Sequence, residues 1–388
     1  MARTSIAVLA AGLTLSIATA ASAQDAGEFR RSTYHDFRIV TVAEGVVRPW
    51  SMAFLPNGDM LVTEREGRLR VVRDGTLMPD AVAGVPEVHA RGQGGLMDVV
   101  PHPDFASNRL LYLSYSKRLA DPDSSTTTIV RGRFENDRLT DVEELFVANT
   151  NGRNGHYGSR IVFDGQGYMF FSIGDRQRPP SGDLEAHAAQ DRSNHHGTIN
   201  RLHDDGRIPS DNPFIGEEGV EPSIWSYGHR NPQGLTMDYA TGDLWATEHG
   251  PQGGDEVNLI KPGLNYGWPV VGYGVNYGEG LRIHESTMRE GMENPSYVWV
   301  PSIGTSGLMF YTGERFPAWR GDLFAGGLAG EQISRLTLDG DVVISEETMV
   351  HRMGRIRDVR QGPDGFIYVA FESRSGEPST IVRLEPAY

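Results

Sequence analysis

The sequence predicts an all-β fold, a six-bladed β-propeller, and three observations lead to it. The 47 glycines and 22 prolines are spread along the 388-residue chain, which is typical of many short strands joined by turns. Helical periodicity is scarce, and only Asp183 to Arg192 could form a short helix. Turn signals, finally, recur along the whole chain.

Six of these turns precede short apolar runs. Three are of the Asn-Gly or Asp-Gly kind that favours hairpins, namely Pro56-Asn57-Gly58-Asp59, Phe163-Asp164-Gly165-Gln166-Gly167 and Pro363-Asp364-Gly365. Three weaker copies are His102-Pro103-Asp104-Phe105, Thr241-Gly242-Asp243 and Arg320-Gly321-Asp322. A strand-turn-strand unit cannot bury both of its faces alone, so the units must stack, and radial stacking gives a propeller. A β-sandwich with similar turns is the alternative, but it explains six copies less easily.

Residues 1–23 have the pattern of a secretory signal peptide. Arg3 precedes an apolar run from Ile6 to Ala20, and Ala21-Ser22-Ala23 is a small-residue cleavage site. We therefore expect residues 24–388 to form a single propeller domain that is periplasmic or secreted. No later segment has the roughly 18 uninterrupted apolar residues of a membrane span, so no membrane insertion is expected.

Composition narrows the possible chemistry and partners. Cysteine is absent, which excludes disulfides and thiol catalysis. The formal net charge of -15 disfavours nucleic acid and anionic membranes as partners, while neutral sugars and divalent cations remain possible. Simple solubility is the alternative explanation for the acidity.

Residues with distinctive chemistry precede or begin the first strand of several repeat units. In a propeller, equivalent ends of equivalent strands converge on one mouth of the central channel, so these residues are expected to surround a single ligand. They are Gln93, His156, Arg230, Asn231, Arg355 and Arg357.

His156 is the candidate general base. Glycines flank the segment around it, and an imidazole that titrates near neutrality can take a proton from a substrate hydroxyl. An ordinary loop histidine is the alternative.

The arginines and amides favour an anionic ligand. Arg230 offers a rigid guanidinium fork for a carboxylate or quinone oxygen, and Arg355 and Arg357 alternate so that both lie on one face of a strand. Their pairing with Asp358 or Glu372 is the alternative. Asn231 and Gln93 can each donate and accept hydrogen bonds.

A hard cation is also indicated. Gly250 and Pro251 lie in a loop that can present main-chain oxygens, and Glu256 adds a carboxylate, although Asp255 and Glu256 could also be plain surface charge. The histidine spacing does not match a zinc site. Neither a dinucleotide fingerprint nor a Gly-x-Ser-x-Gly elbow occurs, which disfavours nicotinamide enzymes and serine hydrolases.

With these residues in place, nearly the whole predicted mature chain resembles the soluble pyrroloquinoline quinone (PQQ) dependent aldose sugar dehydrogenases, relatives of soluble quinoprotein glucose dehydrogenase. The motifs that carry the resemblance are Gly92-Gln93-Gly94-Gly95-Leu96, Gly155-His156-Tyr157-Gly158-Ser159-Arg160, Tyr227-Gly228-His229-Arg230-Asn231-Pro232-Gln233-Gly234, Glu248-His249-Gly250-Pro251, Gly254-Asp255-Glu256, Asn265-Tyr266-Gly267-Trp268-Pro269 and Arg355-Ile356-Arg357-Asp358-Val359.

The resemblance implies oxidation of an aldose at C1 to the lactone, with PQQ and Ca²⁺ as cofactors and an external electron acceptor as partner. It implies that His156 is the base and that PQQ is held by Gln93, Arg230, Asn231, Tyr277, Arg355 and Arg357. It further implies that the carbonyls of Gly250 and Pro251 bind one calcium, and that Glu256 and the carbonyl of Tyr266 bind a second. We expect a monomer or a homodimer.

Two positions depart from relatives in the family. Ala329 stands where relatives carry a lysine that reaches PQQ, so one cationic contact is lost. Gly155 stands where the glucose-specific relatives place an aspartate, which favours broad sugar specificity. Two other functions stay open from the residues alone, a calcium-dependent lactonase and a non-enzymatic carbohydrate-binding propeller.

Overall fold

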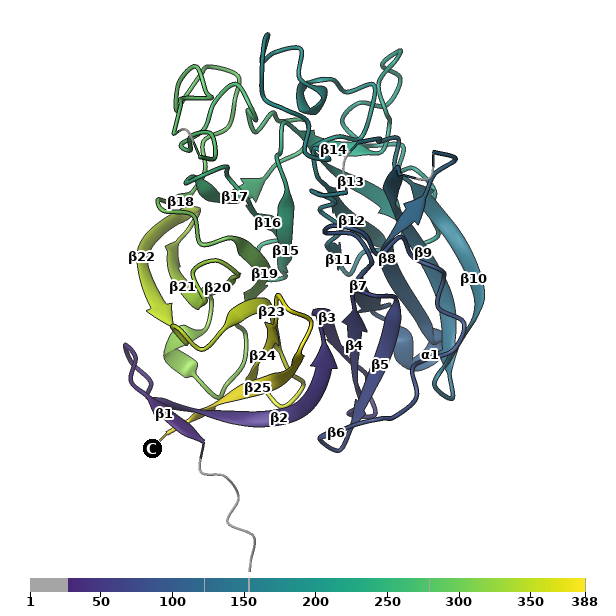
Figure 1. Cartoon of the computed structure of the whole chain (residues 1–388), viewed down its shortest axis with the longest axis vertical. Coiled ribbons are helices and arrows are strands. Elements are labelled where there is room, and N and C mark those ends of the chain that lie inside the picture. The colour runs from purple at the N-terminus through teal and green to yellow at the C-terminus, as the bar shows by residue number, and fades with distance from the viewer. Residues whose placement is uncertain (1–26, 122, 153, 279, 388) are drawn as a thin grey trace, which may run out of the picture.

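The structure is a computed structural model that describes residues 27–121, 123–152, 154–278 and 280–387. Six antiparallel sheets are arranged as blades around a common axis (Figure 1). The predicted all-β class and the six-bladed propeller are therefore confirmed. The predicted signal peptide, residues 1–23, lies outside the described residues.

Blades 1 to 5 each consist of four consecutive strands, with the first strand innermost. Blade 1 contains β3 (Pro49–Phe54), β4 (Met60–Glu64), β5 (Arg68–Arg73) and β6 (Thr76–Leu77). Blade 2 contains β7 (Leu96–Pro101), β8 (Leu110–Arg118), β9 (Ser125–Glu135) and β10 (Arg138–Val147). Blade 3 contains β11 (Ile161–Phe163), β12 (Tyr168–Ile173), β13 (Thr198–His203) and β14 (Ile224–Tyr227). Blade 4 contains β15 (Pro232–Asp238), β16 (Asp243–Glu248), β17 (Asp255–Ile260) and β18 (Tyr297–Trp299). Blade 5 contains β19 (Thr305–Phe310), β20 (Leu323–Gly327), β21 (Gln332–Asp339) and β22 (Val342–Met349).

Blade 6 closes the ring by joining the two ends of the described chain. Its strands, from the axis outward, are β23 (Arg355–Gln361), β24 (Ile367–Glu372), β25 (Pro378–Pro386), β2 (Phe37–Val47) and β1 (Glu28–Arg30). The N-terminal β2, purple in Figure 1, pairs antiparallel with the C-terminal β25 along its whole length. This pairing ties the first blade of the sequence to the last and leaves no open seam in the ring.

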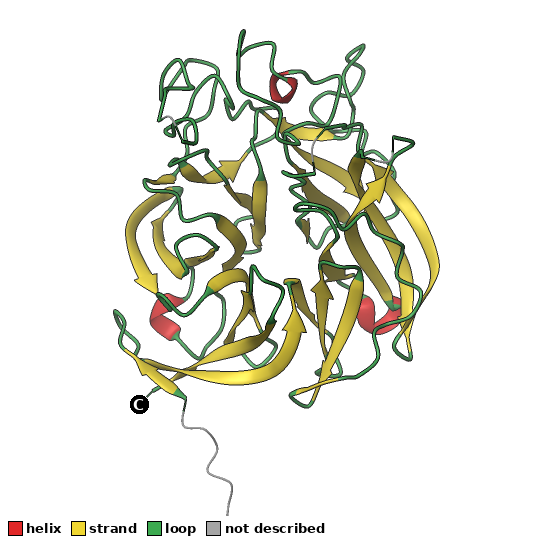
Figure 2. Ribbon diagram, in the orientation of Figure 1, coloured by secondary structure: helices red, strands yellow, loops and turns green. Residues whose placement is uncertain are grey.

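The six predicted turns each join the first and second strand of one blade. All innermost strands therefore begin at the same end of the axis, which we call the mouth, and all second strands return to it. Helix is sparse in the described residues (Figure 2), where it comprises α1 (Phe105–Asn108) and the 3₁₀ turns η1 (Ala188–Gln190) and η2 (Pro317–Trp319). Of these, η1 lies inside the stretch predicted as a short helix, and none of the described helices is long and apolar enough to cross a membrane.

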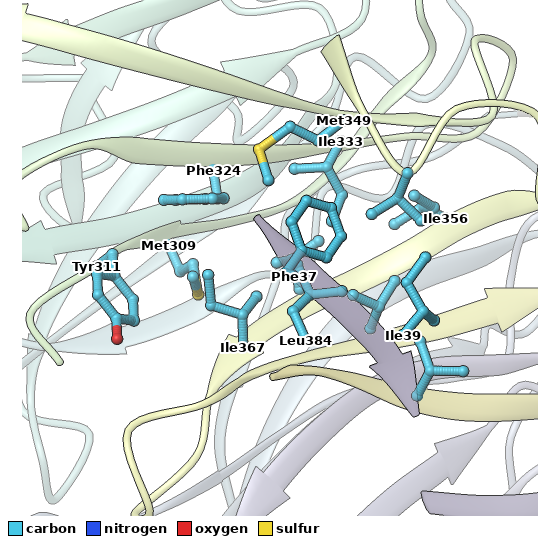
Figure 3. Close-up of a cluster of buried hydrophobic side chains, with 14 of the residues drawn as sticks. Phe37, Ile39, Met309, Tyr311, Phe324, Ile333, Met349, Ile356, Ile367 and Leu384 are labelled. Atoms are coloured by element: carbon cyan, nitrogen blue, oxygen red, sulfur yellow. The ribbon is translucent and has the colours of Figure 1, made fainter. Parts of the chain in front are cut away.

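The hydrophobic core is divided into wedges between neighbouring blades. Each of the six blade interfaces has its own apolar cluster, and the largest packs blade 5 against blade 6. Figure 3 shows this cluster, where Phe37 and Ile39 of β2 meet Met309 of β19 and Ile356 of β23. Because inner strands are covered on both faces, β4 and β24 are buried at every residue, whereas the outer β22 is largely exposed.

Candidate active site

The predicted site residues of blades 2, 3, 4 and 6 lie around the mouth. Hydrogen bonds connect these blades: the His156 N–H donates to Gln93 Oε1 (2.8 Å), the Gly158 N–H to Asn231 Oδ1 (3.1 Å), and Arg357 Nη1 to Gln233 Oε1 (3.0 Å). Residues separated by up to 264 positions, from Gln93 to Arg357, thus surround one place, as the repeat predicts.

His156 is held in one orientation by a buried carboxylate. Its Nδ1 lies 2.6 Å from Asp175 Oδ1, and Asp175 Oδ2 accepts a hydrogen bond from Trp268 Nε1 (2.8 Å). The ionised carboxylate can only accept, so Nδ1 carries the proton and Nε2 is left as the acceptor. Burial first, and then the charge of Arg230, lower the pKa of His156, so the ring is neutral at ordinary pH and can act as a base.

Asp175 belongs to a set of four acids that the sequence analysis did not recognise as a set, although it named Glu372 as a possible partner of Arg355 and Arg357. In four blades a buried carboxylate stands at the end of the second strand or just after it. Each of these carboxylates lies at the mouth, beside the first strand of its own blade. These acids are Glu64, Asp175, Glu248 and Glu372. They bind, in the same order, the Val47 N–H (2.7 Å), His156, the Arg230 N–H (2.6 Å) and Arg357 (2.6 Å). A carboxylate at the end of the apolar run after each turn is the sequence signal that could have revealed them.

A cavity of about 230 Å³ opens at the mouth and is rich in arginine. Arg355 and Arg357 do reach the same side of β23, and both approach Glu372 Oε2, at 3.7 and 2.6 Å. The alternative pairing with Glu372 is therefore present. Arg65 lies 3.9 Å from the same carboxylate, so one negative charge faces three guanidinium groups. Further residues that line the cavity are Arg48, Trp50, Gln93, Gln233, His249, Leu328 and Arg374.

Arg230 and Asn231 carry buried donors without a partner among the described residues. Arg230 Nη1 donates to the carbonyls of His249 (3.2 Å) and Gly250 (2.7 Å), and its guanidinium lies 5.1 Å from the Trp268 ring centre. Its Nε, together with Asn231 Nδ2 and Arg355 Nε, makes no hydrogen bond. Buried unpaired donors are costly, and a ligand that accepts hydrogen bonds would satisfy them.

The four predicted metal-binding residues, Gly250, Pro251, Glu256 and Tyr266, line a second cavity of about 20 Å³. Burial and the nearby charge of Glu248 raise the pKa of Glu256, a conflict that a bound cation would relieve. In the described part of the chain no three His, Asp or Glu side chains form a metal cluster, so a cation here would depend on main-chain oxygens.

Tyr277 lies apart from the other predicted PQQ-binding residues. Its hydroxyl donates to the Pro251 carbonyl (3.1 Å), but its side chain is 66% exposed and it lines neither of the two cavities. Ala329 is exposed at the edge of the mouth, and its neighbour Leu328 accepts a hydrogen bond from Arg355 Nη1 (3.0 Å). Position 329, where relatives carry a lysine, is thus next to the arginine-rich cavity.

The mouth combines a carboxylate-oriented histidine with an excess of guanidinium groups, and this defines a propeller enzyme with a site for an anionic ligand. Residues 46–383 match the glucose/sorbosone dehydrogenase family model, and the chain belongs to this family. The predicted resemblance to sugar dehydrogenases and the assignment as an oxidoreductase are confirmed.

Relatives cover almost the whole chain. Aldose sugar dehydrogenase YliI of Escherichia coli is 43% identical over 345 residues, which is 87% of this chain and 90% of the relative. The crystal structure of the soluble aldose sugar dehydrogenase of Escherichia coli in the apo form has a TM-score of 0.84 at 39% identity, covering 90% of this chain and all of that one. The PQQ-bound aldose sugar dehydrogenase of Streptomyces coelicolor has a TM-score of 0.72 at 28% identity, covering 90% of this chain and 98% of that one.

Proposed function

We propose that the protein oxidises aldose sugars at C1 to the lactone, with PQQ and Ca²⁺ as cofactors and an external electron acceptor. The observation that carries this proposal is the position of the buried His156–Asp175 pair, which is hydrogen-bonded to Gln93 of the arginine-rich cavity. Unpaired buried donors of Arg230, Asn231 and Arg355 add to it. The names of the relatives support it, because one is an aldose sugar dehydrogenase and another was solved with PQQ bound.

The donor set of the mouth suits PQQ, which carries carboxylates and quinone oxygens and therefore only accepts at these groups. Gln93, Arg230, Asn231, Arg355 and Arg357 would hold it, with Tyr277 at the rim. The carbonyls of Gly250 and Pro251 would bind Ca²⁺, and Glu256 with the carbonyl of Tyr266 a second Ca²⁺. When bound, PQQ supplies the hydride acceptor and Ca²⁺ a Lewis acid beside it.

His156 performs the proton transfer in this proposal. Its free Nε2 takes the proton of the anomeric hydroxyl while hydride leaves C1, so that the C1–O bond becomes the lactone carbonyl. Asp175 holds Nδ1 and stabilises the imidazolium that forms. Trp268 fixes the second oxygen of Asp175, which keeps the ring from turning away from the mouth.

Reconstitution of the purified protein tests the proposal. Protein loaded with PQQ and Ca²⁺ should reduce a redox dye in the presence of aldoses, and protein without PQQ should not. Hydrolysis of a lactone without PQQ would favour a lactonase, and sugar binding without dye reduction a carbohydrate-binding propeller. If either result is found and no aldose causes dye reduction under any loading condition, the dehydrogenase proposal is refuted.

We also propose that the chain is exported to the periplasm or secreted, as a monomer or a homodimer. Amino-terminal sequencing of the exported protein should begin at Gln24. A mature protein that retains Met1 would contradict export by this signal, and gel filtration decides between the two oligomeric states.

A further inference from the structure

The side chain of Gln177 occupies the space beside the residue that precedes the catalytic histidine candidate. A Cβ atom placed on Gly155 would lie only 2.3 to 2.6 Å from the Cδ, Oε1 and Nε2 atoms of Gln177. The backbone of Gly155 is not left-handed, so its conformation does not demand glycine. A larger residue at 155 would displace the amide of Gln177, which lies directly against the Cα of Gly155.

The segment that carries Gln177 is bound firmly to the site. The Asp175 N–H donates to the Arg230 carbonyl (2.8 Å), and the Arg176 N–H to the His156 carbonyl (3.3 Å). The Gln177 N–H donates to Asp175 Oδ1 (2.8 Å), the oxygen that also binds His156 Nδ1. The backbone that presents Gln177 is therefore positioned by the same carboxylate as the imidazole.

This local conformation is strained. Arg176 and Gln177 have φ angles of 58° and 56°, which non-glycine residues adopt at a cost of roughly 1 kcal/mol or more each. Consecutive residues in this region persist only where the surroundings hold them, and such strain is concentrated at functional sites.

The amide of Gln177 is free to bind a ligand. The side chain is half-buried, and within the described residues its Oε1 and Nε2 make no hydrogen bond. A neutral amide that can donate and accept at once matches a sugar hydroxyl, which does the same. Gln177 contacts Gly155, the residue that precedes His156, so its amide lies near the candidate base.

We propose that Gln177 is a specificity-determining residue that binds a hydroxyl of the aldose close to C1. The proposal rests on the proposed function, since it needs the sugar to be oxidised at His156. The proposal also accounts for the glycine at 155, because the Gln177 amide fills the space that a side chain at 155 would occupy.

Two substitutions test the contact without strain of their own. Gln177→Gly relieves the left-handed φ while it removes the amide, and Gln177→Asn keeps an amide on a residue that tolerates this φ but shortens its reach. Kinetics with PQQ and Ca²⁺ saturating should be measured for an aldose and for its analogues that each lack one hydroxyl. Titration of PQQ into each variant, followed by fluorescence, provides a readout that does not depend on turnover.

In Gln177→Gly we expect KM for the full aldose to rise about tenfold, as for one lost hydrogen bond. KM for the analogue without the bound hydroxyl should not change, and the variant should no longer distinguish the two sugars. PQQ affinity should match the wild type, and the melting temperature should not fall, because glycine relieves the left-handed φ. Equal KM changes for every analogue, or none, would overturn the proposal.

Gly155→Ala gives a second, independent test. Its new Cβ must displace the Gln177 amide, so KM should rise as in Gln177→Gly although no group that touches the sugar has been removed. The double variant Gly155→Ala with Gln177→Gly should be no worse than Gln177→Gly alone. Additive effects would overturn the proposal. Loaded wild-type protein that binds PQQ but oxidises no aldose would refute the proposed function, and this inference with it.

Discussion

Two charged clusters lie near the axis of the propeller, one inside the ring and one at its mouth. Inside the ring, Asp98 Oδ1 lies 3.4 Å from Arg160 Nη1 and 3.2 Å from Arg360 Nη2, while Asp358 pairs with the same two arginines at 3.1 and 3.0 Å. These two carboxylates and two guanidinium groups come from blades 2, 3 and 6, so the cluster joins blades across the axis.

The mouth has a different balance. In its arginine-rich cavity Glu372 is the one carboxylate among the described lining residues, and it faces Arg65, Arg355 and Arg357, on a protein whose net charge is -15. In a balanced buried cluster each charge has its partner and removal of one member is costly, whereas an excess of one sign leaves charge for a ligand. The difference indicates that arginines of the inner cluster serve the fold, and those of the mouth serve binding.

Arg160→Met should have the largest effect on stability. It leaves Asp98 and Asp358 with Arg360 as their remaining partner in the cluster, and breaking a buried ion pair costs about 3–5 kcal/mol. Chemical denaturation measures the loss. Arg133→Met, which removes a surface pair with Glu135, should cost less than about 1 kcal/mol. Equal losses for the two variants would mean that the inner cluster does not hold the blades together.

His156→Asn is the corresponding change at the mouth, and it should affect turnover rather than folding. Loss of a general base lowers kcat by about 10²–10⁴-fold, whereas PQQ binding and the unfolding midpoint should stay near those of the wild type. Steady-state dye reduction measures the rate. The control is His351→Asn, at an exposed histidine, which should be fully active. A His156→Asn enzyme with wild-type kcat would remove this residue from the base role.

Arg357→Gln should separate binding from stability. Arg355 and Arg65 still face Glu372 in this variant, so the buried carboxylate keeps cationic neighbours and the stability loss should be well below that of Arg160→Met. The Kd for PQQ should rise about 10- to 100-fold, the effect of a lost charge-assisted hydrogen bond. Fluorescence titration of the apo protein measures it. Unchanged PQQ affinity together with a large stability loss would mean that Arg357 belongs with the inner cluster.

Sequence patterns predict the blades that surround the site, and they predict one residue in several of its contacts. The turns before Met60, Tyr168 and Phe366 predict the blades, and the start of each first strand predicts Gln93 and His156, because identical units must present identical ends to the axis. The acids that close the second strands could have been found in the same way. Thr63-Glu64 and Thr247-Glu248 are equivalent ends of equivalent strands.

Contacts made by the long loops could not be predicted. Trp268 reaches Asp175 from the connection between β17 and β18, and Gln177 reaches Gly155 from that between β12 and β13. Neither loop has a repeating pattern, so its path depends on packing against other blades. The charge balance of the cavity could not be predicted either. Three arginines from two blades share Glu372, and this depends on the directions of their side chains.

The smallest expected effect is a shift in pH dependence, caused by the excess positive charge of the mouth. Burial and then Arg230 lower the pKa of His156 from 6.5, so its neutral, basic form persists below that pH and the acid limb of kcat/KM should lie below it. Arg230→Gln removes the positive neighbour, so at saturating PQQ this limb should move to higher pH. Arg360→Gln should leave the limb in place, because Arg360 lies inside the ring and pairs with Asp98 and Asp358. A limb that moves to lower pH in Arg230→Gln would show that the charge of the mouth does not control the base.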